Sequence, residues 1–337
     1  MNGSESPKPF HILALSGGGF RGLYTATVLE ELESALGAPL GQRFDLICGT
    51  SVGGLLAMGL AAEIPASELG RIFTEHGEDI FGSQPWWRRI GRGLFRAKHS
   101  DMGLRHTLDG IFEGRLLGDL RHPVLIPAVN YSTGRAQIFK TPHHPRLEQD
   151  HKLTLVDVAL ATSAAPVFLP LAENSRGVFC DGGLIGNSPG FFGLHEAKHF
   201  MNADPKAVRM LAIGTMSLGN TVPGSARRDR GIIDWGEALF SLMISAQESS
   251  TNFVLQHELD NRYVRIDDDA TPDQVDDIRH IDVVSPAAIK TLTVRGRNAA
   301  QAALGKDLFM PFRAHLAAPP AFFHGPNKNT ELPKCRT

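Results

Sequence analysis

A chain of 337 residues with 42% hydrophobic and 21% charged residues is long enough to bury a large core as one α/β unit. Its formal net charge of -2 at pH 7 gives no overall attraction to nucleic acid, so no nucleic-acid partner is expected. Its cysteines (Cys48, Cys180 and Cys335) are too few and too scattered for a disulfide framework or a zinc site, which favours a reducing, cytoplasmic location. The first nine residues lack a signal-peptide pattern, and no apolar run approaches the ~18 residues needed to cross a bilayer.

The first informative stretch is a glycine-rich loop between two predicted elements. Residues 11–16 form a short apolar run that predicts a buried strand, and apolar residues at helical spacing from Leu29 to Leu36 predict a helix. The loop between them presents several backbone N–H groups to one point, which suits the phosphates of a dinucleotide or the oxyanion of an acyl transfer. A dinucleotide site needs an acidic residue at the end of the second strand, about 20 residues on, and here that strand ends in a serine turn. We therefore favour an oxyanion hole built from Gly17, Gly18, Gly19, Phe20, Arg21 and Gly22.

The serine turn itself has the pattern of a nucleophile elbow. An apolar run at residues 44–48 predicts a strand, and small apolar residues at 55–62 predict a helix. Between them, Gly49 and Gly53 flank Ser51 and lack the Cβ atoms that would obstruct a sharp turn. The N-terminus of the following helix would face any negative charge that develops at Ser51. An ordinary strand-to-helix turn is the alternative, because Gly, Ser and Thr also form such turns.

A third site follows the predicted strand at residues 178–180. This strand delivers Asp181 into a turn formed by Gly182 and Gly183, although an Asp-Gly turn alone is common. A buried carboxylate whose pKa rises towards neutrality can act as the general base for a nearby hydroxyl. A serine–aspartate dyad then needs no histidine and no metal, whereas a histidine-assisted esterase would use one of the 14 histidines. We expect His143 and His144 to lie in an exposed loop, and residues 267–269 to form a solvated acidic turn.

Two basic stretches are candidates for contacts with lipid or ligand. Residues 84–98 combine tryptophans with cations, which is typical of a membrane interface or a lid, although a packed surface loop or an anionic-ligand pocket would also fit. A second basic loop is expected at residues 221–230. The candidate contacts are Trp86, Trp87, Arg88, Arg89, Arg227 and Arg228.

The remaining pattern predicts an alternation of strands and helices within a single domain. Strands are expected at residues 124–130, 134–140, 208–215 and 262–267, and helices at 67–81, 104–112, 155–162 and 235–259. Ser285 before Pro286 predicts the start of a helix that runs to about Leu304. We assign residues 1–9 to an N-terminal tail, 10–310 to one domain and 311–337 to an irregular, partly disordered C-terminal tail.

Together, the glycine loop, the serine elbow and the aspartate turn resemble the motifs of the patatin-like phospholipase family, over the first half of the chain. The resemblance implies a three-layer α/β/α fold with a mainly parallel sheet and hydrolysis of fatty-acyl esters, usually of phospholipids, without a cofactor. It implies Ser51 as nucleophile, Asp181 as base, the N–H groups around Gly18 and Gly19 as oxyanion donors, and Arg21 as support for that loop. The sequence departs from many relatives at Asn187-Ser188-Pro189, where two asparagines commonly precede the proline.

The chain is similar in particular to the cyclic-nucleotide-activated phospholipases of bacterial anti-phage systems. That resemblance implies a cyclic dinucleotide activator and peripheral action on phospholipids at the inner face of the cytoplasmic membrane. The basic stretches at residues 88–98 and 227–230 would then contact nucleotide phosphate or lipid headgroup. A constitutive esterase without nucleotide control and a non-hydrolytic nucleotide-binding module are the alternatives, and a homo-oligomer is compatible with the sequence.

Overall fold

The computed structural model describes residues 7–81, 97–216, 229, 232–278 and 282–331, and they are built around one eight-stranded sheet. The strand order is β5-β6-β3-β2-β1-β7-β8, with β4 paired to β3. The strands are β1 (Phe10–Leu15), β2 (Leu46–Gly49), β3 (Val124–Asn130), β4 (Arg135–Lys140), β5 (Ala172–Asn174), β6 (Gly177–Asp181), β7 (Val208–Ile213) and β8 (Tyr263–Ile266).

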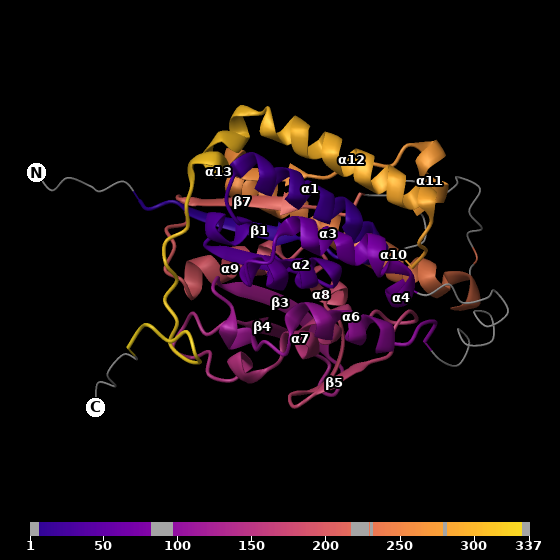
Figure 1. Ribbon diagram of the computed structural model, residues 1–337, viewed down its shortest axis with the longest axis horizontal. Helices are drawn as coiled ribbons and strands as arrows, with labels where there is room; N and C mark the ends of the chain where they lie inside the picture. Colours follow the sequence, from indigo (N-terminus) through magenta and orange to yellow (C-terminus); the bar gives the residue numbers. More distant parts are fainter. Residues whose placement is uncertain (1–6, 82–96, 217–228, 230–231, 279–281, 332–337) are drawn as a thin grey trace, which may run out of the picture.

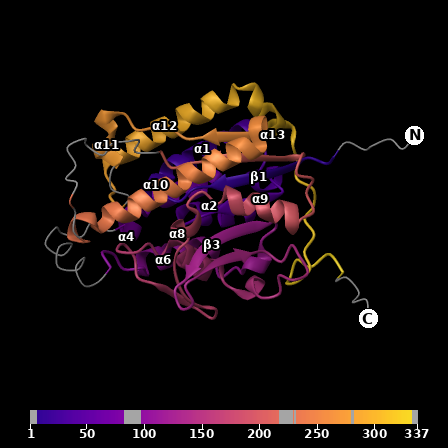
Figure 2. The same ribbon diagram turned by 180° about the vertical axis from the view of Figure 1, so that it is seen from behind.

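Helices cover both faces of this sheet. Figure 1 shows α1, α2, α3 and α12 over one face, and Figure 2 shows α9 and α10 over the other. The predicted three-layer α/β/α fold is therefore confirmed. The helices are α1 (Gly22–Leu36), α2 (Val52–Ala61), α3 (Ala66–Glu75), α4 (Gly77–Phe81), α6 (Met102–Phe112), α7 (Leu155–Ser163), α8 (Gly183–Gly186), α9 (Gly190–His199), α10 (Ile232–Leu259), α11 (Pro272–Ile278), α12 (Pro286–Leu304) and α13 (Met310–Ala314).

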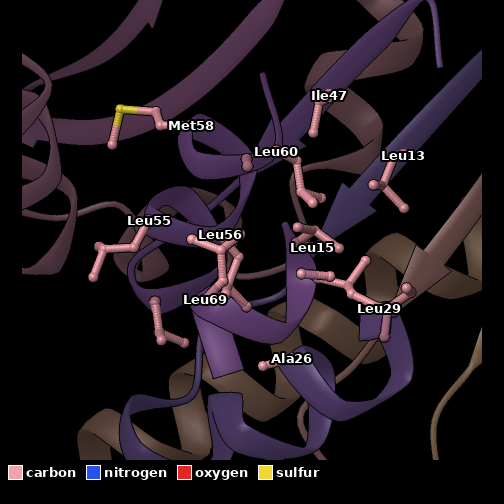
Figure 3. Packing of buried hydrophobic residues seen from close by; sticks show 14 of the residues in the cluster. Leu13, Leu15, Ala26, Leu29, Ile47, Leu55, Leu56, Met58, Leu60 and Leu69 are labelled. Carbon is pink, nitrogen blue, oxygen red and sulfur yellow. The ribbon is translucent and has the colours of Figure 1, made fainter. Parts of the chain in front are cut away.

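The alternation of side chains along the strands divides the core into two layers. In β1, Leu13 and Leu15 join the larger apolar cluster with α1, α2 and α12, whereas Ile12 and Ala14 join the smaller cluster with α9 and the end of α10. Strands buried on both faces require continuous apolar runs, which is why they were readable in the sequence. Figure 3 shows part of the larger cluster, where Leu29 of α1 and Leu56 of α2 pack close to Leu15.

The register of the sheet brings the candidate catalytic segments to one edge. Strands β2, β1, β7 and β8 are parallel, so the loops that follow them emerge together. Strand β6 is antiparallel to β3, yet Asp181 pairs with Ala128, only three residues beyond the point where Leu125 pairs with Cys48 of β2. Asp181 therefore lies level with the turn that carries Ser51.

Residues 315–331 are packed rather than disordered, which differs from the expectation for this part of the tail. His315 Nε2 lies 2.7 Å from Asp45 Oδ2, and Ala317 N–H donates to Gln42 O at 2.9 Å. Phe322 is only 2% exposed. This C-terminal segment (residues 315–331) has little regular structure but crosses the edge of the sheet at which β1 and β2 begin.

Candidate active site

Ser51 occupies a strained turn between β2 and α2. Its φ of 53° and ψ of −127° are unusual for a residue with a side chain, and such conformations are concentrated at functional sites. The turn closes tightly because Gly53 approaches the end of β1, where an added Cβ would lie 2.4 Å from Leu15 O. A side chain at this position would push the elbow away from the strand, so the glycine is needed for the turn.

Three hydrogen bonds fix the elbow against its neighbours. The backbone N–H of Ser51 donates to Thr162 Oγ1 at 3.0 Å, and the Thr162 hydroxyl donates to Pro127 O at 2.5 Å. The Thr50 hydroxyl donates to Gly186 O at 2.6 Å, which joins the elbow to the turn after Asp181. Thr162 escaped the sequence analysis because a threonine within an apolar helix carries no positional signal of this role.

Asp181 lies against the serine and is 3% exposed. Its Oδ1 accepts a hydrogen bond from the Gly183 N–H at 2.6 Å, and the Ser51 side chain lies close enough to the carboxylate to affect its pKa. Burial raises the pKa of Asp181 to about 6, and the hydrogen bonds from Gly183 and Ser51 oppose that rise. At neutral pH the group is therefore mostly ionised yet basic enough to take a proton, which a general base requires.

The glycine loop lies beside this pair. The N–H of Gly17 is already used, because it donates to Asn187 O at 3.1 Å. The amides of Gly18 and Gly19 are donors that the loop can offer to an oxyanion. Gly19 has a φ of 57°, a backbone conformation that favours glycine, so the loop's shape depends on this residue type.

Arg21 is partly buried and ties this loop to the segment after β7. Its Nη1 donates to Met216 O at 3.1 Å, and Met216 N–H donates to Asp267 Oδ1 at 3.0 Å. Burial lowers the pKa of Arg21, while Glu248 and Asp267 act in the opposite direction. The expectation of a solvated turn is wrong for Asp267, which is largely buried and pairs with Arg265.

A cavity of about 600 Å³ opens onto Ser51 and Asp181, a volume typical of small-molecule sites. One part of its wall is apolar and suits a hydrocarbon chain, whereas another part is polar and charged. The polar wall includes Arg21, Glu248, Arg265 and Asp267. The apolar wall includes Val52, Leu55, Leu56, Ile72, Phe73, Ile80, Phe81, Leu104, Phe168, Leu169, Phe240 and Ile244.

The positions of two histidines are relevant to the alternative, histidine-assisted mechanism. His99 lines the cavity, but its Nε2 lies 3.0 Å from Asp282 Oδ2. His143 was expected in an exposed loop and is instead buried, with its Nε2 3.0 Å from Glu196 Oε1. The geometry therefore favours the carboxylate of Asp181, rather than an imidazole, as the partner of Ser51.

Several candidate residues lie outside the described part of the chain. These are Trp86, Trp87, Arg88, Arg89, Arg227 and Arg228. Among the described residues, no group of three or more His, Cys, Asp or Glu side chains is arranged to hold a metal ion. No helix in the same part of the chain is both long and apolar enough to cross a membrane.

Comparisons with known proteins point to one family. The model of the family described as patatin-like phospholipase matches residues 13–190, which contain all three motifs. A Pseudomonas aeruginosa (strain BWHPSA011 / Pa011) protein named cGAMP-activated phospholipase is 59% identical, over 97% of this chain and 98% of the relative. A Vibrio cholerae protein of the same name is 36% identical, over 86% and 90%. An Escherichia coli protein named cUMP-AMP-activated phospholipase is 29% identical, over 64% and 68%.

Burial of an ionised Asp181 should make the site a source of instability. The raised pKa means that the native state binds this proton more tightly than the unfolded chain, so the contribution of Asp181 to stability falls as pH rises from about 4 to about 6. Replacing Asp181 by Asn should therefore raise the unfolding free energy by up to ~3 kcal/mol at pH 7–8, and by little below pH 4. Thermal unfolding of both proteins across this pH range measures the difference. Asp109→Asn, at an exposed position, is the control, and its difference in unfolding free energy from wild type should not change with pH. A pH-independent difference for Asp181→Asn as well would contradict the idea.

Proposed function

Because this chain belongs to the patatin-like phospholipase family, and so to the carboxylic-ester hydrolases, we propose that Ser51 and Asp181 carry out its lipid acyl hydrolysis. The family predicted from the three motifs is confirmed by the comparisons. The observation that carries the assignment of residues is the meeting of three features in one cavity wall: Ser51 on its strained turn, the buried Asp181 carboxylate and the glycine loop.

The geometry supports a two-step reaction through an acyl-enzyme. Ser51 Oγ attacks the ester carbonyl while Asp181 takes the hydroxyl proton, and the N–H groups of Gly18 and Gly19 bind the oxyanion of the tetrahedral intermediate. The proton on Asp181 then passes to the departing alcohol. A water molecule, deprotonated in turn by Asp181, attacks the acyl-enzyme, and Asp181 returns that proton to Ser51 Oγ as the fatty acid is released. These steps use only side chains and amides of the chain itself.

The substrate is a fatty-acyl ester of a membrane phospholipid. The apolar wall of the cavity would hold an acyl chain, and the polar wall would lie towards the glycerol and the headgroup. The outer face of α10 supports peripheral contact with the lipid surface, because it exposes an apolar stripe with no charged member. This α10 stripe consists of Leu239, Leu242, Met243, Phe253 and Val254, which are 38–67% exposed.

The α10 stripe borders the cavity. Ser245 and Ser249 line the cavity. Leu242 lies three residues before Ser245 and Phe253 lies four residues after Ser249, so these pairs are neighbours on the helix surface. A lipid surface seated on the stripe would therefore lie beside the entrance to the catalytic serine.

We take a cyclic dinucleotide as the activator, with cGAMP as the first candidate. Two of the relatives described above carry cGAMP in their names, and a more distant one carries cUMP-AMP, so relatives differ in the nucleotide to which they respond. The enzyme would then act from the cytoplasm on the inner face of the membrane, and a role in anti-phage defence follows from such control. A constitutive esterase is the competing possibility.

Hydrolysis of phospholipid vesicles, with and without cGAMP, tests activity and control together. The wild type should release fatty acid only with the nucleotide, and Ser51→Ala should be inactive in both conditions because it lacks the nucleophile. cUMP-AMP, added at the same concentration, is the control for nucleotide identity. Equal hydrolysis with and without any nucleotide would support the constitutive esterase, and activity of Ser51→Ala would remove Ser51 from the mechanism.

The pH dependence should report the carboxylate. Asp181 must be ionised to accept the serine proton, so kcat/KM on a water-soluble ester should be level above pH 7 and fall about tenfold per pH unit well below the pKa of about 6. Asp181→Asn should lose on the order of 10²- to 10⁴-fold in kcat at pH 8. Full activity of that variant, or disappearance of the acid limb in His99→Gln, would support the histidine-assisted mechanism instead.

Substitutions on the α10 stripe should separate membrane contact from chemistry. Leu242→Glu with Met243→Glu should reduce co-sedimentation with phosphatidylethanolamine–phosphatidylglycerol vesicles by roughly tenfold or more, because two apolar contacts are lost and charge is added. Hydrolysis of a water-soluble ester should stay within about twofold of wild type. Val294→Glu, at a 45% exposed apolar position on α12, is the matched control. Unchanged vesicle binding by the double variant would exclude this face.

A further inference from the structure

Glu248 lies on α10 and belongs to none of the sequence motifs, yet three donors converge on its carboxylate. Oε1 accepts hydrogen bonds from the Ser16 hydroxyl at 2.7 Å and from Arg265 Nη2 at 3.0 Å. Oε2 accepts one from Asn187 Nδ2 at 3.0 Å. The side chain is 18% exposed, so these bonds form largely away from solvent. We infer that Glu248 is a positioning residue that holds the glycine loop and the turn after Asp181 in their catalytic arrangement.

Two of the three donors, Ser16 and Asn187, come from the segments that the proposed reaction must keep aligned. Ser16 immediately precedes the glycine loop, and Asn187 follows the turn that begins at Asp181. These segments also bond directly, because Asn187 Nδ2 donates to Gly17 O at 3.2 Å and Gly17 N–H donates to Asn187 O. Glu248 thus completes a closed set of contacts around Asn187, and the adjacent Gln247 accepts from the Asn187 N–H at 2.7 Å.

The negative charge of Glu248 also balances the positive charge of nearby arginines. Glu248 and Asp267 are the anions that face the partly buried Arg21 and Arg265, so the cluster contains two cations and two anions. A glutamine at position 248 would leave the two guanidinium groups with one carboxylate. Its amide would also offer only one oxygen to three donors, so at least one of Ser16, Asn187 and Arg265 would lose its hydrogen bond to this side chain.

Glu248 also lines the cavity, so a direct contact with substrate is the competing role. The two roles predict different kinetics. A group that contacts the ground-state substrate affects KM, whereas a group that aligns the amides of Gly18 and Gly19 affects kcat, because those donors act on charge that develops in the transition state. A small water-soluble ester without a lipid headgroup reduces the contribution of any headgroup contact to the measurement.

The experiment compares Glu248→Gln with Glu258→Gln, a variant on the same helix whose carboxylate lies 3.8 Å from the surface residue Lys198. In the presence of cGAMP, kcat of Glu248→Gln on the water-soluble ester should fall on the order of 10- to 100-fold, with KM within about twofold. The rate of inactivation by a fluorophosphonate should fall by a similar factor. The decrease in kcat/KM below about pH 6 should persist, because it reports the protonation of Asp181. Glu258→Gln should match wild type.

Ser16→Ala tests the same idea with no change of charge, and serves if Glu248→Gln does not fold. It removes one donor to Glu248, and its kcat should fall by roughly 3- to 10-fold at unchanged KM. An unchanged kcat in both variants, or a loss confined to KM, would overturn the inference. The inference rests on the proposed function, whose failure has a different signature, since Ser51→Ala would then retain the wild-type rate.

Discussion

The contact between the Ser51 hydroxyl and the Asp181 carboxylate depends on the register of one strand. β4 occupies one side of β3, and β2 and β6 pair one after the other with its opposite side, in opposite directions, so that the ends of two unrelated segments meet at the same level. A shift of β6 by one residue would reverse which side chains face each layer and would move Asp181 away from the serine. The buried apolar faces of the strands therefore fix the position of the proposed catalytic pair as well as the fold.

The site is held together at a cost in stability that the surrounding contacts must offset. Ser51 has an unfavourable backbone conformation, and Asp181 is a carboxylate buried away from solvent. Thr162 accepts a hydrogen bond from the Ser51 N–H, and Asn187 donates one to Gly17 O in the adjacent glycine loop. Glu248 contributes a negative charge close to two partly buried arginines. The same few residues that the proposed reaction needs therefore lower the stability of the fold, as is common at catalytic sites.

Local patterns predicted the elements, whereas the partners of buried polar groups required the structure. Ser285 does begin α12, where its side chain accepts from the Ala288 N–H, because a helix cap is set by neighbours in the sequence. The grouping of the glycine loop with Ser51 was likewise readable from successive strand-to-helix turns. His143 was not, because its partner Glu196 lies 53 residues away and no sequence period links the two. Glu248 was missed for the same reason, since its three donors come from three separate segments.

The C-terminal segment contacts residues that are very far from it in the sequence. His315 meets Asp45 across 270 residues, and Ala318 N–H donates to the same carboxylate. Contacts at such separation close large loops, and closing a large loop costs chain entropy. Such proteins therefore fold more slowly than proteins whose contacts are mostly local in sequence. The entry edge of β1 and β2 is consequently completed only after nearly all of the polypeptide has become available. Until that moment, nascent chains would expose this edge to chaperones and proteases.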